Sequence, residues 1–273
     1  METTASIKKR LQQAETFEPW MEDLKDDSRK SVQQALASWQ RRYDKKLILL
    51  RRLEEKQAFD RQFKEQNHSL VCGIDEAGRG PLAGPVVTAA VILPEDCSAF
   101  IGLDDSKMIA KAKRNELAQL IKEQAISWSV HIQPPEAIDR LNIYQATKQS
   151  MEAAATSLAT APDVVLADAM KLTVAMPSEA IIKGDAKSLC IAAASILAKT
   201  GRDDLMDEYA RLYPQYGFSK HAGYGTTEHL AALDTHGPLV RPFRPFDEDR
   251  VAVTAGRDLL VPLAEDAGLA VRE

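Results

Sequence analysis

Four carboxylate residues follow short apolar runs along the chain, and they are the residues best placed to do chemistry. Asp75 and Glu76 follow one run, Asp168 follows another, and Asp185 comes just after a third. Strand ends in an α/β sheet are where ligand-binding side chains collect. Carboxylates that gather there repel one another unless a cation lies between them. Oxygen ligands favour magnesium or manganese over zinc, so these residues predict a divalent-metal site.

The residues after Glu76 allow the chain to turn sharply. Adjacent residues on a strand point to opposite faces. Asp75 and Glu76 therefore converge only if the chain turns at once, and Ala77-Gly78-Arg79-Gly80 permits such a turn. The chain contains 40 Asp and Glu residues, so Asp168 or Asp185 taken alone is an ordinary acid at a strand end.

The segments around these residues alternate between strand and helix patterns. Residues 1–70 lack glycine and are helical in spacing from about 31 to 67. The patterns that follow predict strands over 70–74, 84–93, 126–132, 163–167 and 180–183, and helices over 106–124, 136–160 and 188–212, with Ser106 as an N-cap. A hairpin followed by helix-linked strands predicts an α/β domain with a mixed sheet and an N-terminal helical extension.

Several longer motifs carry a family resemblance. The segment GIDEAGRGPLAGPVV, at 73–87, resembles the first motif of the bacterial type 2 ribonucleases H, the ribonuclease HII family. The related type 3 enzymes are less similar, with a lysine where Arg79 stands. Further motifs follow in the family's order: Asp105-Ser106-Lys107, VVLAD at 164–168, KGDAKSLCIAAASILAKTGRDDLM at 183–206, HAGYGTTEH at 221–229, and His236-Gly237-Pro238.

The resemblance implies a ribonuclease H-like fold, with a central mixed five-stranded sheet flanked by helices. It divides the chain into a helical extension at 1–69, a catalytic domain at 70–246 and a tail at 247–273 that we expect to be poorly ordered. Two departures stand out. Ala169 replaces the family's usual glycine, and Arg241-Pro242-Phe243-Arg244-Pro245-Phe246 replaces a His-Arg-x-Ser-Phe-like segment.

The implied activity is hydrolysis of the phosphodiester on the 5′ side of a ribonucleotide, in an RNA–DNA hybrid or embedded in duplex DNA. The products carry a 3′-hydroxyl and a 5′-phosphate. Asp75, Glu76, Asp168 and Asp185 are the implied catalytic residues and the ligands of two divalent ions, manganese or magnesium. Such an enzyme removes misincorporated ribonucleotides and RNA primers.

The resemblance also implies substrate contacts. Gly78, Arg79 and Gly80 would present backbone groups to the 2′-hydroxyl that distinguishes RNA from DNA. Tyr224 would pack against the sugar at the RNA–DNA junction, although a lone tyrosine in a glycine-rich loop is more often a surface residue. Lys107 would contact phosphate or, alternatively, place a charge at a helix start.

One face of the alanine-rich segment 188–212 is polar. Ser195, Lys199 and Arg202 fall at i, i+4 and i+7. This face could meet phosphates of the duplex, or it could be a solvated face with a Lys199–Asp203 pair, and the sequence leaves both open. His221 and His229 are more often structural or exposed than ligands.

Composition limits the class of protein. The net charge of −5 excludes a generally basic nucleic-acid coat, and no apolar run is long enough to span a membrane. The N-terminus lacks the pattern of a secretory signal, and three isolated cysteines fit a reducing compartment. We therefore expect a cytoplasmic protein and, since nothing in the sequence forces assembly, a monomer.

Three alternatives to this interpretation stay open. The first is a nuclease that prefers long RNA–DNA hybrids over single ribonucleotides. The second is a catalytically silent nucleic-acid-binding module, which would be expected to lack one of the four carboxylates. The third is a partner protein in which residues 1–70 bind another molecule and the nuclease-like body is a scaffold.

Overall fold

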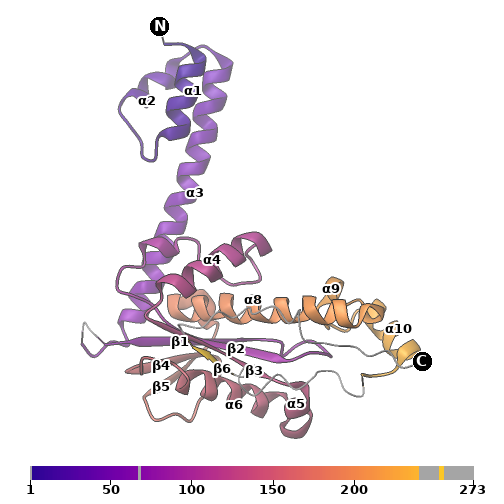
Figure 1. Cartoon of the computed structure of the whole chain (residues 1–273). Helices are drawn as coiled ribbons and strands as arrows, with labels where there is room; N and C mark the ends of the chain where they lie inside the picture. Colours follow the sequence, from indigo (N-terminus) through magenta and orange to yellow (C-terminus); the bar gives the residue numbers. More distant parts are fainter. Residues whose placement is uncertain (1, 67–68, 240–251, 255–273) are drawn as a thin grey trace. The chain divides into compact units, whose positions relative to one another are not determined.

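The computed structural model describes residues 2–66, 69–239 and 252–254. Its contacts divide the chain into two compact units, Met1–Glu55 and Lys56–Glu273. The helix α3 (Lys30–Arg61) contributes to both (Figure 1). It ends six residues earlier than the helical spacing predicts. The division into 1–69, 70–246 and 247–273 stays a prediction, and most of its last segment lies outside the described residues.

The first unit is a small helical body with its own core. It contains α1 (Thr4–Gln13), α2 (Trp20–Asp23), the 3-10 helix η1 (Leu24–Asp26) and most of α3. Trp39 is central, since its indole nitrogen donates to the Ala14 carbonyl at 2.9 Å and its ring stacks on Tyr43. The remaining buried apolar residues are Ile7, Leu11, Ala14, Met21, Leu24 and Val32.

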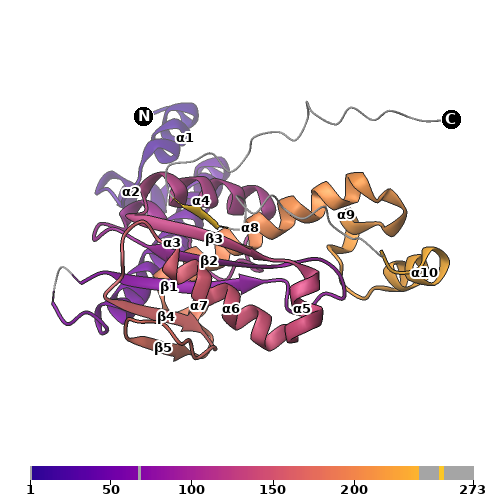
Figure 2. The ribbon, with the colours of Figure 1, turned by 60° about the horizontal axis from the view of Figure 1, so that its bottom comes forward.

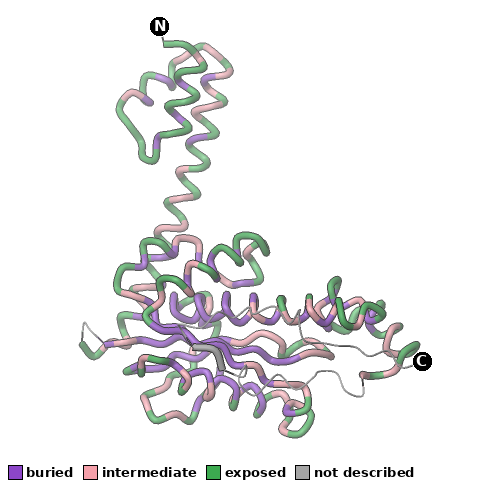
Figure 3. Tube along the Cα trace, in the orientation of Figure 1, coloured by how far each residue is buried: buried purple, intermediate pink, exposed green. Residues whose placement is uncertain are grey.

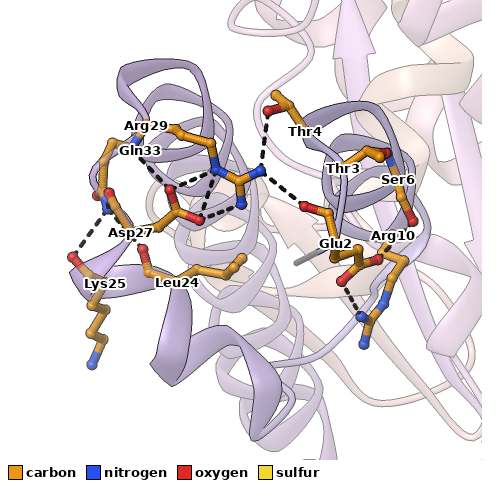
Figure 4. A network of polar contacts seen from close by, with 10 residues as sticks. All are labelled: Glu2, Thr3, Thr4, Ser6, Arg10, Leu24, Lys25, Asp27, Arg29 and Gln33. Atoms are coloured by element: carbon orange, nitrogen blue, oxygen red, sulfur yellow. Dashed lines mark hydrogen bonds and ion pairs between the residues drawn. The ribbon is translucent and has the colours of Figure 1, made fainter.

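Polar contacts close the turn between η1 and α3 (Figure 4). Arg29 binds the Asp27 carboxylate and donates to the Glu2 carbonyl at 2.9 Å. The hydrogen bonds from Arg29 lower the pKa of Asp27 to about 2. Gln33 donates to the carbonyls of Leu24, Lys25 and Asp27. The turn therefore has its backbone acceptors satisfied by side chains from the start of α3.

The second unit is built on a mixed sheet with the strand order β5-β4-β1-β2-β3-β6 (Figure 2). The strands are β1 (Val71–Ala77), β2 (Val86–Ile92), β3 (Ser127–Gln133), β4 (Val164–Asp168), β5 (Ser178–Ile181) and β6 (Ala252–Thr254). β1 pairs antiparallel with β2 and parallel with β4. The mixed α/β sheet is thus confirmed with its five predicted strands, and β6 adds a sixth from the predicted tail.

Helices cover both faces of this sheet (Figure 1). α8 (Leu189–Leu212) packs on β1 and β2 from one side, and α6 (Ile143–Thr156) packs on β2 and β3 from the other. Buried residues accordingly concentrate along the central strands and the inner face of α8 (Figure 3). The other helices of this unit are α4 (Lys111–Gln124), α5 (Pro135–Leu141), α7 (Gly184–Lys187), α9 (Phe218–His221) and α10 (Thr227–His236), with the 3-10 helices η2 (Ser98–Phe100) and η3 (Pro214–Tyr216).

Gly73 lets α8 approach β1 closely. A Cβ at this position would lie 2.1 Å from the Cys190 carbonyl carbon and 2.2 Å from the Ile191 nitrogen. Backbone atoms cannot yield to such a contact, so only glycine fits here. The start of α8 is consequently held against the strand that carries Asp75.

Two predicted helix boundaries are wrong for identifiable reasons. Ser106 does not cap α4, which begins at Lys111; its side chain is buried and accepts a hydrogen bond from Ser195 instead. The predicted helix over 136–160 is two helices, because Asn142 adopts a φ of 71° and caps α6 through its side-chain oxygen. In the described residues no helix is long and apolar enough to cross a membrane.

Candidate active site

The parallel pairing of β1 with β4 places Asp75 beside Asp168. Ile74 lies opposite Ala167 in the register, so the next residue of each strand is one of the two aspartates. Asp75 is 5% exposed, and one of its carboxylate oxygens accepts a hydrogen bond from the Glu76 backbone nitrogen at 2.7 Å. Two carboxylates far apart in sequence are thus brought together by sheet topology.

Glu76 is the next residue along β1, which runs on to Ala77 before the chain turns. Its Oε1 accepts a hydrogen bond from Arg79 at 3.1 Å. Its Oε2 is buried and has no hydrogen-bond partner among the residues that the structure describes. A buried carboxylate oxygen without a donor is an available ligand for a cation.

Asp185 reaches the same region from α7, a single helical turn after β5. The Gly184 nitrogen donates to Asp168 Oδ1 at 2.6 Å, which ties the start of α7 to the end of β4. The Asp185 carboxylate accepts from the Ala186 nitrogen at 2.8 Å. Asp168 therefore links Asp185 to the pair on β1.

The electrostatics of these residues agree with their proximity. Burial, followed by the charges of Glu76 and Asp168, raises the pKa of Asp75 well above its usual value. Burial also raises the pKa of Glu76, against the lowering effect of Arg79. The pKa of Asp185 is raised by burial and then by Asp105 and Asp168. Such a group of acids is stable as anions only with a compensating positive charge.

The residues fit a hard divalent cation in their donor chemistry. All four offer carboxylate oxygens, the ligands that magnesium and manganese prefer, and Glu76 Oε2 has no other partner within the described part of the chain. In residues 2–66, 69–239 and 252–254, however, no three His, Cys, Asp or Glu side chains are arranged as a ready metal cluster. Hydrogen bonds hold one oxygen of each carboxylate on a protein donor instead.

The turn after β1 meets the Tyr224 loop beside these acids. The backbone nitrogens of Leu82 and Ala83 donate to the Gly223 carbonyl at 2.9 and 3.2 Å. A Cβ on Gly80 would lie 3.4 Å from the Tyr224 ring, which is about half exposed. Gly78 has a φ of 111°, a conformation that other residues rarely adopt. An aromatic face and an exposed backbone turn therefore lie side by side.

Arg202 joins these two loops from within the protein. It is 1% exposed, and its guanidinium donates to the carbonyls of Pro85, Ala83 and Ala222 at 3.0–3.1 Å. The sequence left two interpretations of the polar face of α8 open, phosphate binding or exposure to solvent. Arg202 fits neither, because its guanidinium is buried and hydrogen-bonded within the protein. Burial lowers the pKa of Arg202.

The other predicted substrate residues, Ser195, Lys199 and Lys107, differ in burial and in their partners. Ser195 is buried, donates to the Ser106 hydroxyl at 2.9 Å, and lowers the pKa of Asp75 against the larger effect of burial. Lys199 pairs with Asp203, as one of the two readings expects. Lys107 is exposed, and its charge lowers the pKa values of Glu76 and Asp185, against the larger effect of burial.

His221 and His229 are structural residues, which is the more common role of such histidines in proteins. Both are buried and their rings stack with centroids 4.7 Å apart. His221 contacts the Tyr216 carbonyl and His229 contacts the Tyr224 carbonyl, both at 2.9 Å. They hold the Tyr224 loop in shape. The Arg241–Phe246 segment lies outside the described residues.

Sequence reasoning missed several residues that support the site. Asp105 influences the pKa of Asp185, and Arg114 donates to the Ser106 carbonyl at 2.9 Å and to Asp203 at 2.7 Å. Lys56 and Asp60 contact the segment around Asp185. Apart from the Ser106 carbonyl, the partners of these side chains are distant in sequence, so no local spacing reveals them.

Comparison with known proteins agrees with this arrangement. The family pattern described as "Ribonuclease HII" matches residues 72–240, and that of the "Ribonuclease HII N-terminal domain" matches residues 3–64. A ribonuclease HII from Halalkalibacterium halodurans is 50% identical over 234 residues, which cover 85% of this chain and 89% of that protein. One from Enterococcus faecalis is 52% identical, over 78% of this chain and 83% of that protein.

A solved structure shares the fold. The ribonuclease H2 of Pyrococcus horikoshii superposes with a TM-score of 0.52 at 24% identity, over 62% of this chain and 90% of that one. The ribonuclease H-like sheet with flanking helices is therefore confirmed. On the family pattern, the two bacterial relatives and the shared fold, this chain belongs to the ribonuclease HII family.

Proposed function

We propose that this chain is an endonuclease that hydrolyses the phosphodiester on the 5′ side of a ribonucleotide, in an RNA–DNA hybrid or embedded in duplex DNA. The observation that carries the proposal is the pairing of β1 with β4, which sets Asp75 beside Asp168, with Glu76 next to Asp75 on the same strand. These three acids lie near the carboxyl ends of the inner strands β1 and β4, where the Gly78–Gly80 turn leads toward Tyr224. A group of acids beside a glycine turn and an exposed aromatic ring suits cleavage at a ribose.

The reaction is an in-line displacement at phosphorus. A water oxygen forms the new bond to phosphorus, and the bond from phosphorus to the upstream O3′ breaks. The departing O3′ takes up a proton, so the products are a 3′-hydroxyl and a 5′-phosphate. No serine or cysteine nucleophile is required, and the three cysteines are buried and free.

Asp75, Glu76, Asp168 and Asp185 would hold two divalent ions, manganese or magnesium. When bound, such ions supply an activated water and neutralise charge on the leaving oxygen. The protein's own part is to bring four carboxylates together and orient them in a largely buried site. Hydrogen bonds from backbone nitrogens and Arg79 orient them, and Glu76 Oε2 stays available.

Choice of substrate would depend on the turn and the tyrosine. Backbone groups of Gly78, Arg79 and Gly80 would contact the 2′-hydroxyl, since glycines let main chain approach a sugar. Tyr224 would pack on the neighbouring deoxyribose, which has no 2′-hydroxyl to desolvate.

Phosphates on either side of the cut would meet basic and polar side chains. Lys107 and Lys199 are the candidate contacts, and the buried Ser195 would support Asp75 rather than touch the substrate directly. We infer from this activity a cytoplasmic, monomeric enzyme that removes misincorporated ribonucleotides and RNA primers.

The test uses a DNA duplex with one ribonucleotide, incubated with manganese or magnesium. We expect a single cut 5′ to the ribonucleotide, abolished by Asp75→Asn and unaffected by Asp234→Asn, which changes an exposed aspartate on α10. Cleavage of a continuous RNA–DNA hybrid alone would favour the hybrid-degrading alternative. Binding of both duplexes without any cut would favour the silent binding module.

A further inference from the structure

The last turns of α3 carry two buried charged side chains into the catalytic unit. Lys56 is 4% exposed and Asp60 is 6% exposed. The two residues are four apart, so they lie on the same face of the helix. Both belong to the compact unit that contains the sheet. Buried charges are costly unless they find partners, so their contacts indicate what they are for.

Lys56 holds the backbone of Asp185. Its ammonium donates to the Asp185 carbonyl at 2.7 Å and to Asp104 Oδ1 at 3.0 Å, with the Leu103 carbonyl at 3.5 Å. The ammonium therefore joins the loop before Asp105 to the short helix α7.

Asp60 holds the start of α8, four residues after Asp185. Its Oδ2 accepts from the backbone nitrogens of Leu189 and Cys190 at 2.9 and 3.0 Å. Ser188 caps the next free nitrogen, that of Ile191, at 3.1 Å. The first amides of a helix lack partners within it and favour a negative charge. Asp60 therefore fixes both the position and the first turn of α8.

These contacts bracket a segment that has little support of its own. α7 is one turn long, and Lys183 before it has a φ of 56°, an unfavourable conformation for a residue with a side chain. On its sheet side the segment is tied by Gly184 to Asp168. On the other side the ties are Lys56 and Asp60.

We propose that Lys56 and Asp60 are positioning residues for Asp185, which hold α7 and the start of α8 so that the Asp185 carboxylate faces Asp168. The inference rests on the proposed function, in which Asp185 is a metal ligand. It assigns part of the metal site's geometry to a segment matched by the N-terminal domain pattern, at 3–64. Neither residue touches the substrate or the reacting atoms.

The first experiment measures Mn²⁺ binding to the full-length protein without nucleic acid, by calorimetry. Lys56→Met keeps the chain length of the side chain and removes its donors, so we expect affinity to fall about 10- to 100-fold, as for other outer-shell partners. Lys64→Met is the matched control, because it loses a single ion pair to Glu95. The control should bind Mn²⁺ as the unaltered protein does.

A second pair of variants keeps the inference falsifiable if Lys56→Met unfolds. Asp60→Asn retains an oxygen for the two amides, whereas Asp60→Ala retains none. We expect Asp60→Ala to weaken Mn²⁺ binding and Asp60→Asn to restore most of it, with both folded by circular dichroism. Equal Mn²⁺ affinity in the two variants would overturn the role of Asp60.

A double variant separates this inference from the proposed function. If Lys56 acts through Asp185, Lys56→Met should cause no further loss of Mn²⁺ affinity in an Asp185→Asn background, because the two losses share one cause. Normal Mn²⁺ binding by Asp185→Asn would overturn the metal role of Asp185 itself. A loss in Asp185→Asn with normal binding in Lys56→Met would overturn the positioning role alone.

Discussion

At the scale of single residues, Asp75 combines burial with two neighbouring negative charges. Its raised pKa means that the folded chain binds a proton there more readily than the unfolded chain. The free energy of unfolding therefore decreases as the pH rises from the ordinary pKa of about 4 through the raised value. In the absence of metal, this carboxylate destabilises the fold at neutral pH.

We predict that Asp75→Asn stabilises the metal-free protein at pH 7.5 by about 1–2 kcal/mol, a typical gain for relieving functional strain. The gain should disappear near pH 4, because the carboxyl of Asp75 in the folded protein is then protonated and as neutral as the amide of Asn. Thermal unfolding in EDTA at the two pH values measures this. A loss of stability at pH 7.5 would contradict the conclusion that the ionised Asp75 carboxylate destabilises the metal-free protein.

The same raised pKa values predict the pH dependence of metal binding. Asp75, Glu76 and Asp185 must lose protons to act as ligands, and burial raises the pKa of each. Mn²⁺ affinity should therefore fall as the pH decreases, starting at a higher pH than for ordinary carboxylates. Calorimetric titrations between pH 5 and pH 8.5, together with the release of protons on binding, would reveal it.

Ala169 shows the cost of the departure from the family's glycine. Its φ is 48°, so alanine occupies a left-handed conformation directly after Asp168. We predict that Ala169→Gly stabilises the protein by about 0.5–1 kcal/mol, since glycine adopts this conformation without steric cost. Ala153→Gly, inside α6, should instead destabilise by about 1 kcal/mol. Chemical denaturation of the two variants compares them.

At the scale of elements, Arg202 on α8 links two loops that come from different parts of the chain. Its three carbonyl partners lie on the turn after β1 and on the loop before Tyr224. Backbone hydrogen bonds from Leu82 and Ala83 to Gly223 complete the link. The distance from Gly80 to the Tyr224 ring therefore depends on the hydrogen bonds of Arg202.

We predict that Arg202→Met raises KM for the single-ribonucleotide duplex about tenfold or more, because a misplacement near 1 Å has large effects on binding geometry. Stability should fall by about 2–4 kcal/mol, since one buried and two partly buried carbonyls lose a charged donor. Mn²⁺ affinity should not change. Arg211→Met, at an exposed position on the same helix, is the control. An unchanged KM would contradict the linking role.

At the scale of the whole molecule, the compact units divide at Glu55, whereas the pattern of the N-terminal domain extends to residue 64. The nine residues between include Lys56 and Asp60, whose partners all lie in the catalytic unit. The first unit has its own core around Trp39. Its role therefore has to be tested without removing these two side chains.

Two deletions distinguish the roles of the N-terminal residues. We predict that removal of residues 1–55 leaves Mn²⁺ affinity unchanged, whereas removal of 1–67 lowers it, because only the longer deletion removes Lys56 and Asp60. A raised KM in the shorter deletion would indicate that the first unit binds substrate. An unchanged KM would favour a partner-binding arm. Equal Mn²⁺ affinities in the two deletions would contradict the positioning role.

The sequence alone was sufficient for the order of the five predicted strands, and it singled out four acids whose roles stay predictions. Strand and helix patterns are local, and GIDEAGRGPLAGPVV joins Asp75, Glu76 and the Gly78–Gly80 turn within one short segment. The predicted mixed sheet and its five strands are present for this reason. The roles of the substrate residues stay predictions.

Tertiary structure alone decided how these pieces meet. The pairing of β1 with β4 sets Asp75 beside Asp168, and α8 turns Arg202 inward although its spacing predicts an outward polar face. Lys56 and Asp60 bind groups 129 and 130 residues away. Burial and long-range hydrogen bonds depend on which surfaces pack together, and the periodicity of a single segment contains no information about its partner.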